Sequence, residues 1–145
     1  MTMLACKYKY GHGYKEFSIA QEKVLAEVKV AELPPIENLE AAILTAIRQP
    51  IASPALEKLV KPGQKIAFIC NDPTRVANSY AFMPILVKEL NRLGIRDEDM
   101  KIVFALGTHR KMTQEEMVAA VGENVASRLK MYNSDCNDSE AFNYF

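Results

Sequence analysis

Two uninterrupted apolar runs constrain the fold of this chain more than any other feature of its sequence. They occupy residues 66–70 and 102–106, and each directly follows a lysine, at positions 65 and 101. Neither run alternates apolar with polar side chains, and short apolar stretches bounded by turns are typical of strands buried on both faces of a parallel sheet. We therefore predict two such strands and a third, shorter one at residues 129–133.

Helical patterns separate these predicted strands. The first helix is predicted at residues 79–93, with Asn78 or Ser79 as its N-cap. Residues 113–116 form a capping box that opens a helix after the second run, and a further helical turn follows Gly122. The order strand–helix–strand–helix–strand predicts the α/β class, with a mainly parallel sheet, flanking helices and right-handed crossovers.

The N-terminal region has the pattern of a β-hairpin. Residues 6–10 and 14–19 are alternating, aromatic-rich runs on either side of two glycines that flank His12. A glycine-rich turn between two such runs is a hairpin signal, and His12 is interpreted as an exposed turn residue. A third strand is predicted near residues 24–30.

Two helices are predicted between the hairpin and the first apolar run. Apolar residues at helical spacing indicate a helix at residues 37–48. A shorter one is predicted at residues 53–59, with Pro54 at its first helical position. Because 145 residues is typical of one domain, we predict a single α/β domain spanning residues 1–145.

Charge and cysteine content exclude several kinds of partner. The chain has 18 Lys+Arg and 18 Asp+Glu, so its formal net charge is zero. Binding to nucleic acid polymers or to an anionic membrane requires a basic excess, and neither is predicted. Cys6, Cys70 and Cys136 are odd in number and far apart, which argues against disulfides and structural zinc and predicts a reducing cytoplasm. Cys70 is interpreted as a small buried apolar group.

A polar loop follows each of the two apolar runs. The loops span residues 71–75 and 107–111, and they contain an acid, two hydroxyls, one imidazole and three cationic side chains. Loops that follow parallel strands meet at one edge of the sheet, where ligands bind near a topological switch point. Each loop also precedes a helix N-terminus, which favours anions. The sequence thus predicts a pocket for a small carboxylate or phosphate.

Arg75 and His109 have the most direct chemistry in these loops. The planar fork of Arg75 matches a pair of anionic oxygens, and the imidazole of His109 is suited to general base catalysis. Structural alternatives remain open for each residue. Asp72 can cap a turn, Arg75 can form a surface salt bridge of little value, and His109 can be a solvated loop residue.

The two loops resemble those of the nickel-dependent lactate racemase family. The matching segments are residues 71–75 and 107–116, with supporting similarity at residues 51–56, 59–63 and 93–99. The Gly-Thr-His-Arg-x-Met-Thr element is more specific than Asp-x-Thr-Arg. In order and spacing, these segments resemble the N-terminal domain of that family across nearly the whole chain.

The resemblance implies an isomerase of 2-hydroxy acids that carries a nickel-pincer nucleotide. In the family, one histidine takes the hydroxyl proton while a hydride moves to the cofactor, and another histidine supplies a proton when the hydride returns to the opposite face. By this resemblance, Asp72, Pro73, Thr74 and Arg75 bind the cofactor. Arg75 also orients the substrate carboxylate, and His109 is one of the two catalytic histidines.

The chain departs from the family pattern in three places. Residues 76–79 replace a proline-rich element, and Ser134-Asp135 stands where the family often has His-Asp. The family's tethering lysine, nickel ligand and second catalytic histidine lie further along a longer chain, so no metal ligand is predicted here. We therefore expect residues 1–145 to be the N-terminal part of a lactate racemase-like enzyme, incomplete where residues 141–145 resemble an unfinished strand.

Two other functions remain open on the sequence alone. One is a binding module that holds a nucleotide or a small carboxylate without chemistry, because a single base cannot serve both faces of a planar intermediate. The other is a structural fragment that associates with another copy through apolar residues at its open end.

Overall fold

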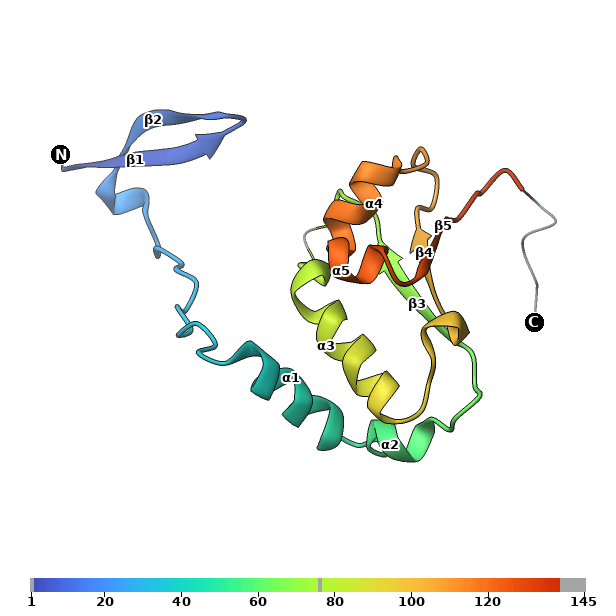
Figure 1. The fold of residues 1–145 in the computed structure, drawn as a ribbon. Helices are drawn as coiled ribbons and strands as arrows, with labels where there is room; N and C mark the ends of the chain where they lie inside the picture. The colour runs from blue at the N-terminus through green and yellow to red at the C-terminus, as the bar shows by residue number, and fades with distance from the viewer. Residues whose placement is uncertain (1, 76, 139–145) are drawn as a thin grey trace. The chain divides into compact units, whose positions relative to one another are not determined.

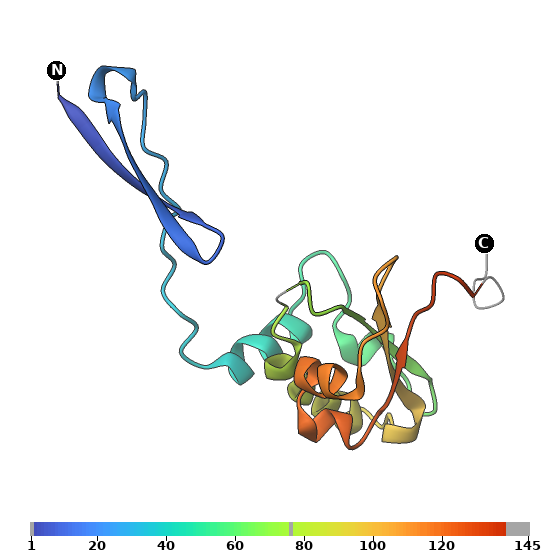
Figure 2. The same cartoon turned by 90° about the horizontal axis from the view of Figure 1, so that it is seen from above.

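The computed structural model describes residues 2–75 and 77–138. The strand predicted at residues 141–145 therefore lies outside the described residues. The chain divides into two compact units, Met1–Pro35 and Ile36–Phe145. Figure 1 labels the elements of both units, and Figure 2 shows them from above. None of the helices within the described ranges is long and apolar enough to cross a membrane.

The first unit is the predicted β-hairpin. Strands β1 (Met3–Tyr10) and β2 (Gly13–Ala20) pair antiparallel along their whole length, so Tyr10 lies opposite Gly13. The turn between them begins at Gly11, whose φ of 57° lies in the left-handed region that glycine adopts without strain. His12 is exposed in this turn, as predicted.

The third strand predicted in this region is wrong. A 3₁₀ turn at Gln21–Lys23 follows β2, and residues 24–30 form neither helix nor strand. Leu25 and Val28 are almost fully exposed. A β-branched apolar sequence favours a strand only where another strand supplies hydrogen bonds and packing, and this segment lacks that partner within the described residues.

The second unit contains a parallel sheet, which confirms the predicted α/β class. Its strands lie side by side in chain order: β3 (Ile66–Asn71), β4 (Met100–Ala105) and β5 (Lys130–Asn133). The helices that connect them are α3 (Ser79–Arg92), α4 (Gln114–Val121) and α5 (Glu123–Ala126). All of these elements form close to their predicted positions, and they are drawn together in Figure 1.

Within the described residues, helices cover only one face of this sheet. Along β4, Ile102 and Phe104 are fully buried whereas Lys101 is exposed, and on β3 the Ile69 side chain is 69% exposed. The prediction that both strands are buried on both faces is therefore wrong. When parallel strands follow one another in a single direction with crossovers of one hand, every connecting helix lies on the same face. The order of the described strands runs in one direction across the sheet, from β3 to β4 to β5. A topological switch point requires this order to reverse, so none lies among the described strands.

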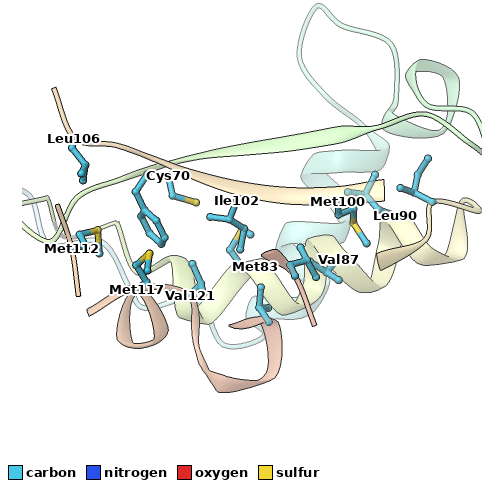
Figure 3. Packing of buried hydrophobic residues seen from close by; sticks show 14 residues of the cluster. Cys70, Met83, Val87, Leu90, Met100, Ile102, Leu106, Met112, Met117 and Val121 are labelled. Carbon is cyan, nitrogen blue, oxygen red and sulfur yellow. The ribbon is translucent and has the colours of Figure 1, made fainter. Parts of the chain in front are cut away.

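Helix α3 supplies the middle of the hydrophobic core. Met83, Val87 and Leu90 recur at helical spacing and pack against the inward face of the sheet (Figure 3). Met117 and Val121 of α4 join the same cluster. The core thus fixes the helices that follow β3 and β4, and with them the loops in which polar residues are concentrated.

The two earlier helices are shorter than predicted. Helix α1 (Leu39–Arg48) begins after Asn38, whose side chain accepts a hydrogen bond from the backbone of Ala41 at 2.9 Å. Helix α2 (Leu56–Leu59) begins after Ala55, so the prediction of Pro54 as its first helical residue is wrong. Ala55 keeps an extended backbone, with ψ of 150°, and the helical turn starts only after it.

A buried carboxylate joins α1 to α3. The side chain of Glu89 is 5% exposed and receives paired hydrogen bonds of 3.1 Å from Arg48 and of 2.9 Å from Arg92. The hydrogen bonds from Arg92 and Arg48 lower the pKa of Glu89 from its usual 4.5 to about 2. The carboxylate is therefore ionised in the folded chain at neutral pH.

We expect Glu89→Gln to lower the free energy of unfolding at pH 7 by about 1–2 kcal/mol, because both half-exposed arginines lose a charged acceptor. The pKa is lower in the folded state, so this stabilisation is complete above pH 4.5 and is lost as the pH falls through about 2. Urea unfolding over that range measures it. A difference between the two proteins that stays constant down to pH 2 would contradict the assignment.

Candidate functional site

A carboxylate–imidazole contact joins the two predicted loops at the carboxyl edge of the sheet. Asp72, directly after β3, is 6% exposed, and one of its oxygens contacts Nδ1 of His109. Its other oxygen accepts a hydrogen bond of 2.7 Å from the hydroxyl of Thr74. The hydrogen bonds from His109 and Thr74 lower the pKa of Asp72. Asp72 is thus an ionised carboxylate whose two oxygens serve different partners.

This contact determines which nitrogen of His109 is available for chemistry. Because ionised Asp72 can only accept, Nδ1 carries the proton and donates it. Nε2 is then the nitrogen that can accept a proton from another molecule. The side chain of His109 is 54% exposed, and its backbone N–H donates to the carbonyl of Leu106 at 3.0 Å, which closes a turn within the loop.

A cavity of about 300 Å³ lies on the Asp72 side of this contact. Its wall consists of the loop after β3, the start of α3 and one face of α4. Of the predicted site residues in the described ranges, Asp72, Pro73 and Arg75 line the cavity. Thr74 and His109 do not line the cavity. Each of them contacts Asp72, which does.

Two of the three predicted cations already have partners. Arg110 makes a bidentate ion pair with Glu116 at 2.6 and 2.8 Å, and Lys111 contacts Asp135 at 2.7 Å. In contrast, the guanidinium of Arg75 has no hydrogen-bond or ion-pair partner among residues 2–75 and 77–138. The alternative of a surface salt bridge therefore has no support in the described residues, and Arg75 is the cation that an anion in the cavity can meet.

The two helix N-termini at this edge differ. In α4 the side chain of Thr113 accepts from the backbone of Glu116 while the Glu116 carboxylate accepts from the backbone of Thr113, which confirms the predicted capping box. In α3 the N-cap is Asn78, one of the two predicted candidates, but its left-handed backbone, with φ of 53°, comes without a side-chain cap. The first turn of α3 also has no acidic residue, so this N-terminus is the one suited to an anion.

Sequence reasoning missed a second role of Glu116. The sequence indicates only a capping role, yet Glu116 also lines the cavity, and its carboxylate pairs with the guanidinium of Arg110. The spacing of Arg110 and Glu116 across the start of a helix is the one signal that could have indicated the pair. Cys70 behaves as predicted: it is buried in the core, and burial raises the pKa of its thiol.

No group of three or more His, Cys, Asp or Glu side chains in the described part of the chain could hold a metal ion. The fold and the site together define an α/β domain with a cavity at the carboxyl edge of a parallel sheet. The sequence model of one family, described as the lactate racemase N-terminal domain, matches residues 10–145. The chain therefore belongs to the lactate racemase N-terminal domain family.

Two curated relatives confirm this membership. The chain is 26% identical over 133 residues to lactate racemase of Thermoanaerobacterium thermosaccharolyticum, a match covering 90% of this chain and 31% of that protein. It is 34% identical over 82 residues to lactate racemase of Lactiplantibacillus plantarum, a match covering 57% of this chain and 19% of that protein. The matched region thus spans less than a third of either relative.

Proposed function

We propose that this chain is the N-terminal α/β domain of a nickel-pincer-dependent racemase or epimerase that acts on lactate or a related 2-hydroxy acid. The observation that carries this proposal is that Asp72 contacts His109 and lines the same cavity as Arg75, whose guanidinium has no partner among the described residues. In the proposal, residues 1–145 are completed by a further part of the protein, which is their partner. The free thiols of Cys6, Cys70 and Cys136 support a cytoplasmic protein.

The chemistry of a 2-hydroxy acid matches these groups. Its carboxylate needs a cation, and the planar fork of Arg75 can bind both carboxylate oxygens. Its hydroxyl lies on the neighbouring carbon and must lose a proton, which Nε2 of His109 accepts while Asp72 holds Nδ1. A single imidazole serves one face of the substrate, so the base for the opposite face comes from the remaining part of the protein.

The cavity also fits the phosphate of a nucleotide cofactor. Arg75 supplies a cation that has no partner within residues 2–75 and 77–138, and the start of α3 lacks both a side-chain cap and an acidic residue in its first turn. Asp72, Pro73, Thr74 and Arg75 form the segment that would hold the cofactor. When bound, a nickel-pincer nucleotide supplies the acceptor for the hydride of the substrate. No cluster in the described residues binds nickel, so the proposal assigns its protein ligand to the remaining part of the protein.

The Arg75→Gln substitution tests the anion site in this chain. We expect it to weaken binding of lactate and of nicotinate mononucleotide by about 10-fold or more, because a charged, bidentate contact is lost. Calorimetric titration of the 145-residue chain measures both affinities. Arg96→Gln is the matched control, since Arg96 pairs with Glu98 and Asp99 outside the cavity, and it should bind like the wild type.

Each result of this titration has a distinct meaning. Failure of the wild-type chain to bind either compound would contradict the anion site and weaken both the racemase proposal and the binding-module alternative. Binding that is unaffected by Arg75→Gln would show that the anion lies elsewhere and would remove Arg75 from the site.

A further inference from the structure

Ser134, the residue directly after β5, is hydrogen-bonded to the beginning of the loop that carries His109. The hydroxyl of Ser134 accepts a hydrogen bond of 2.9 Å from the backbone N–H of Leu106, the first residue after β4. In return, the N–H of Ser134 donates to the carbonyl of Phe104 at 3.0 Å. The loop therefore leaves β4 at a point where its backbone is tied to the neighbouring strand.

The preceding residue of β5 holds the other end of the loop. The carboxamide of Asn133 makes two hydrogen bonds with the backbone of Met112: its oxygen accepts from the N–H at 3.2 Å, and its nitrogen donates to the carbonyl at 3.0 Å. The side chain of Asn133 thus pairs with both backbone polar groups of Met112. A carboxamide is the side chain that matches such a donor–acceptor pair.

His109 lies midway between these two anchors, three residues after Leu106 and three before Met112. The side chains of Leu106 and Met112 are both buried at the same end of the hydrophobic cluster (Figure 3). Between them the loop is exposed, and its backbone is held at the two ends in addition to the turn that His109 closes on Leu106 and the ion pair of Arg110 with Glu116. A contact of Lys111 with Asp135 adds little, because the lysine is exposed to solvent.

We propose that Asn133 and Ser134 are positioning residues that place the imidazole of His109 against Asp72. The two strands beside β4 then act on His109 from different directions: β3 holds the ring through Asp72, and β5 holds the backbone of the loop. This inference rests on the proposed function, because it is the role of His109 as a base that makes the placement matter.

The Asn133→Ala substitution in the isotope-labelled 145-residue chain tests this role. We expect the amide of Met112 to exchange its hydrogen about 10-fold faster, with exchange in β3 and β4 unchanged. The neutral ring of His109 should lose its single Nδ1–H tautomer, so that the nitrogen-15 signals of its two ring nitrogens move towards each other. His12, in the separate hairpin unit, provides an internal reference that should not move.

Matched variants distinguish a loss of His109 positioning from a general loss of structure. Asn124→Ala removes an exposed carboxamide on α5 and should change neither the exchange of Met112 nor the ring signals. Ser134→Ala should repeat the loss of the single tautomer, and Ser134→Thr should restore it, because threonine keeps the hydroxyl. If Asn133→Ala does not fold, the two Ser134 variants decide the question.

The proposal is overturned if His109 keeps one tautomer in both alanine variants, even where Met112 exchanges faster. Because these measurements need neither substrate nor cofactor, that failure would leave the proposed role of His109 intact. In the complete protein, Asn133→Ala is expected to lower kcat by about 10- to 100-fold while KM stays unchanged, since a misplaced base affects the reaction step. An unchanged kcat would also count against the proposal.

Discussion

Replacing His109 by glutamine is expected to lower the rate of racemisation by the complete protein by about 10²- to 10⁴-fold, the contribution typical of a positioned general base. Glutamine can still donate a hydrogen bond to Asp72, so the buried carboxylate keeps a partner and the loop keeps its fold. It has no nitrogen that can accept a proton from a substrate hydroxyl. The variant thus removes the chemistry of His109 while it preserves its structural contact.

The control for this substitution is His12→Gln, since His12 is the exposed histidine of the hairpin turn and is not among the residues that line the cavity. Steady-state kinetics in both directions, from the D and from the L acid, measure the effect. Racemisation by His109→Gln within a few-fold of wild type would contradict the assignment. If that variant also bound lactate normally, the alternative of a binding module without chemistry at this site would be favoured.

The second large effect is expected from Asp72→Asn, which should lower kcat by about 10²-fold because the ring of His109 is no longer held in its productive orientation. The carboxamide has nearly the same shape as the carboxylate, but its nitrogen cannot accept from Nδ1–H, and its oxygen is an uncharged and weaker acceptor that does not stabilise the ring when it takes up a proton. Since the pKa of Asp72 is lowered below its usual 3.8, wild-type Asp72 stays ionised throughout the neutral and mildly acidic range.

Thr74→Val is the matched control, because it removes the other hydrogen bond of Asp72 and leaves the contact with His109 in place. We expect kcat at saturating cofactor to change by only a few-fold, because Thr74 belongs to the segment proposed to hold the cofactor and its loss acts on cofactor affinity. Profiles of kcat against pH for the three proteins test the difference. An equal loss in Thr74→Val and Asp72→Asn would show that Asp72 matters for the structure of the loop and not for the orientation of the imidazole.

Much of the fold was predictable because local sequence carries the information. The apolar runs identify β3 and β4, and the glycine-rich turn identifies the hairpin. The capping box at Thr113 and Glu116 marks the start of α4, since its hydrogen bonds join residues three apart. The strand predicted at residues 24–30 failed for the complementary reason: a strand needs a partner, and a partner is not a local property.

Burial could not be predicted in the same way. The runs that form β3 and β4 are apolar on both faces, and a sequence with that pattern is compatible with helices on both sides of the sheet. The consecutive strand order β3-β4-β5 places the connecting helices on one side and leaves residues such as Ile69 exposed within the described part of the molecule. Strand order depends on the packing of the whole unit.

The sequence by itself determined which chemical groups reach the carboxyl edge of the sheet, because it places an acid, a cation and an imidazole directly after two strands. Only the tertiary structure decided how they combine. The register of β3 and β4 sets Asn71 beside Ala105, so Asp72 emerges level with the loop that carries His109. The same folding pairs Arg110 and Lys111 with carboxylates and leaves the guanidinium of Arg75 without a partner in the described residues. Pairings of this kind join residues far apart in the chain, and their distances are fixed by sheet register and core packing, which no local pattern encodes.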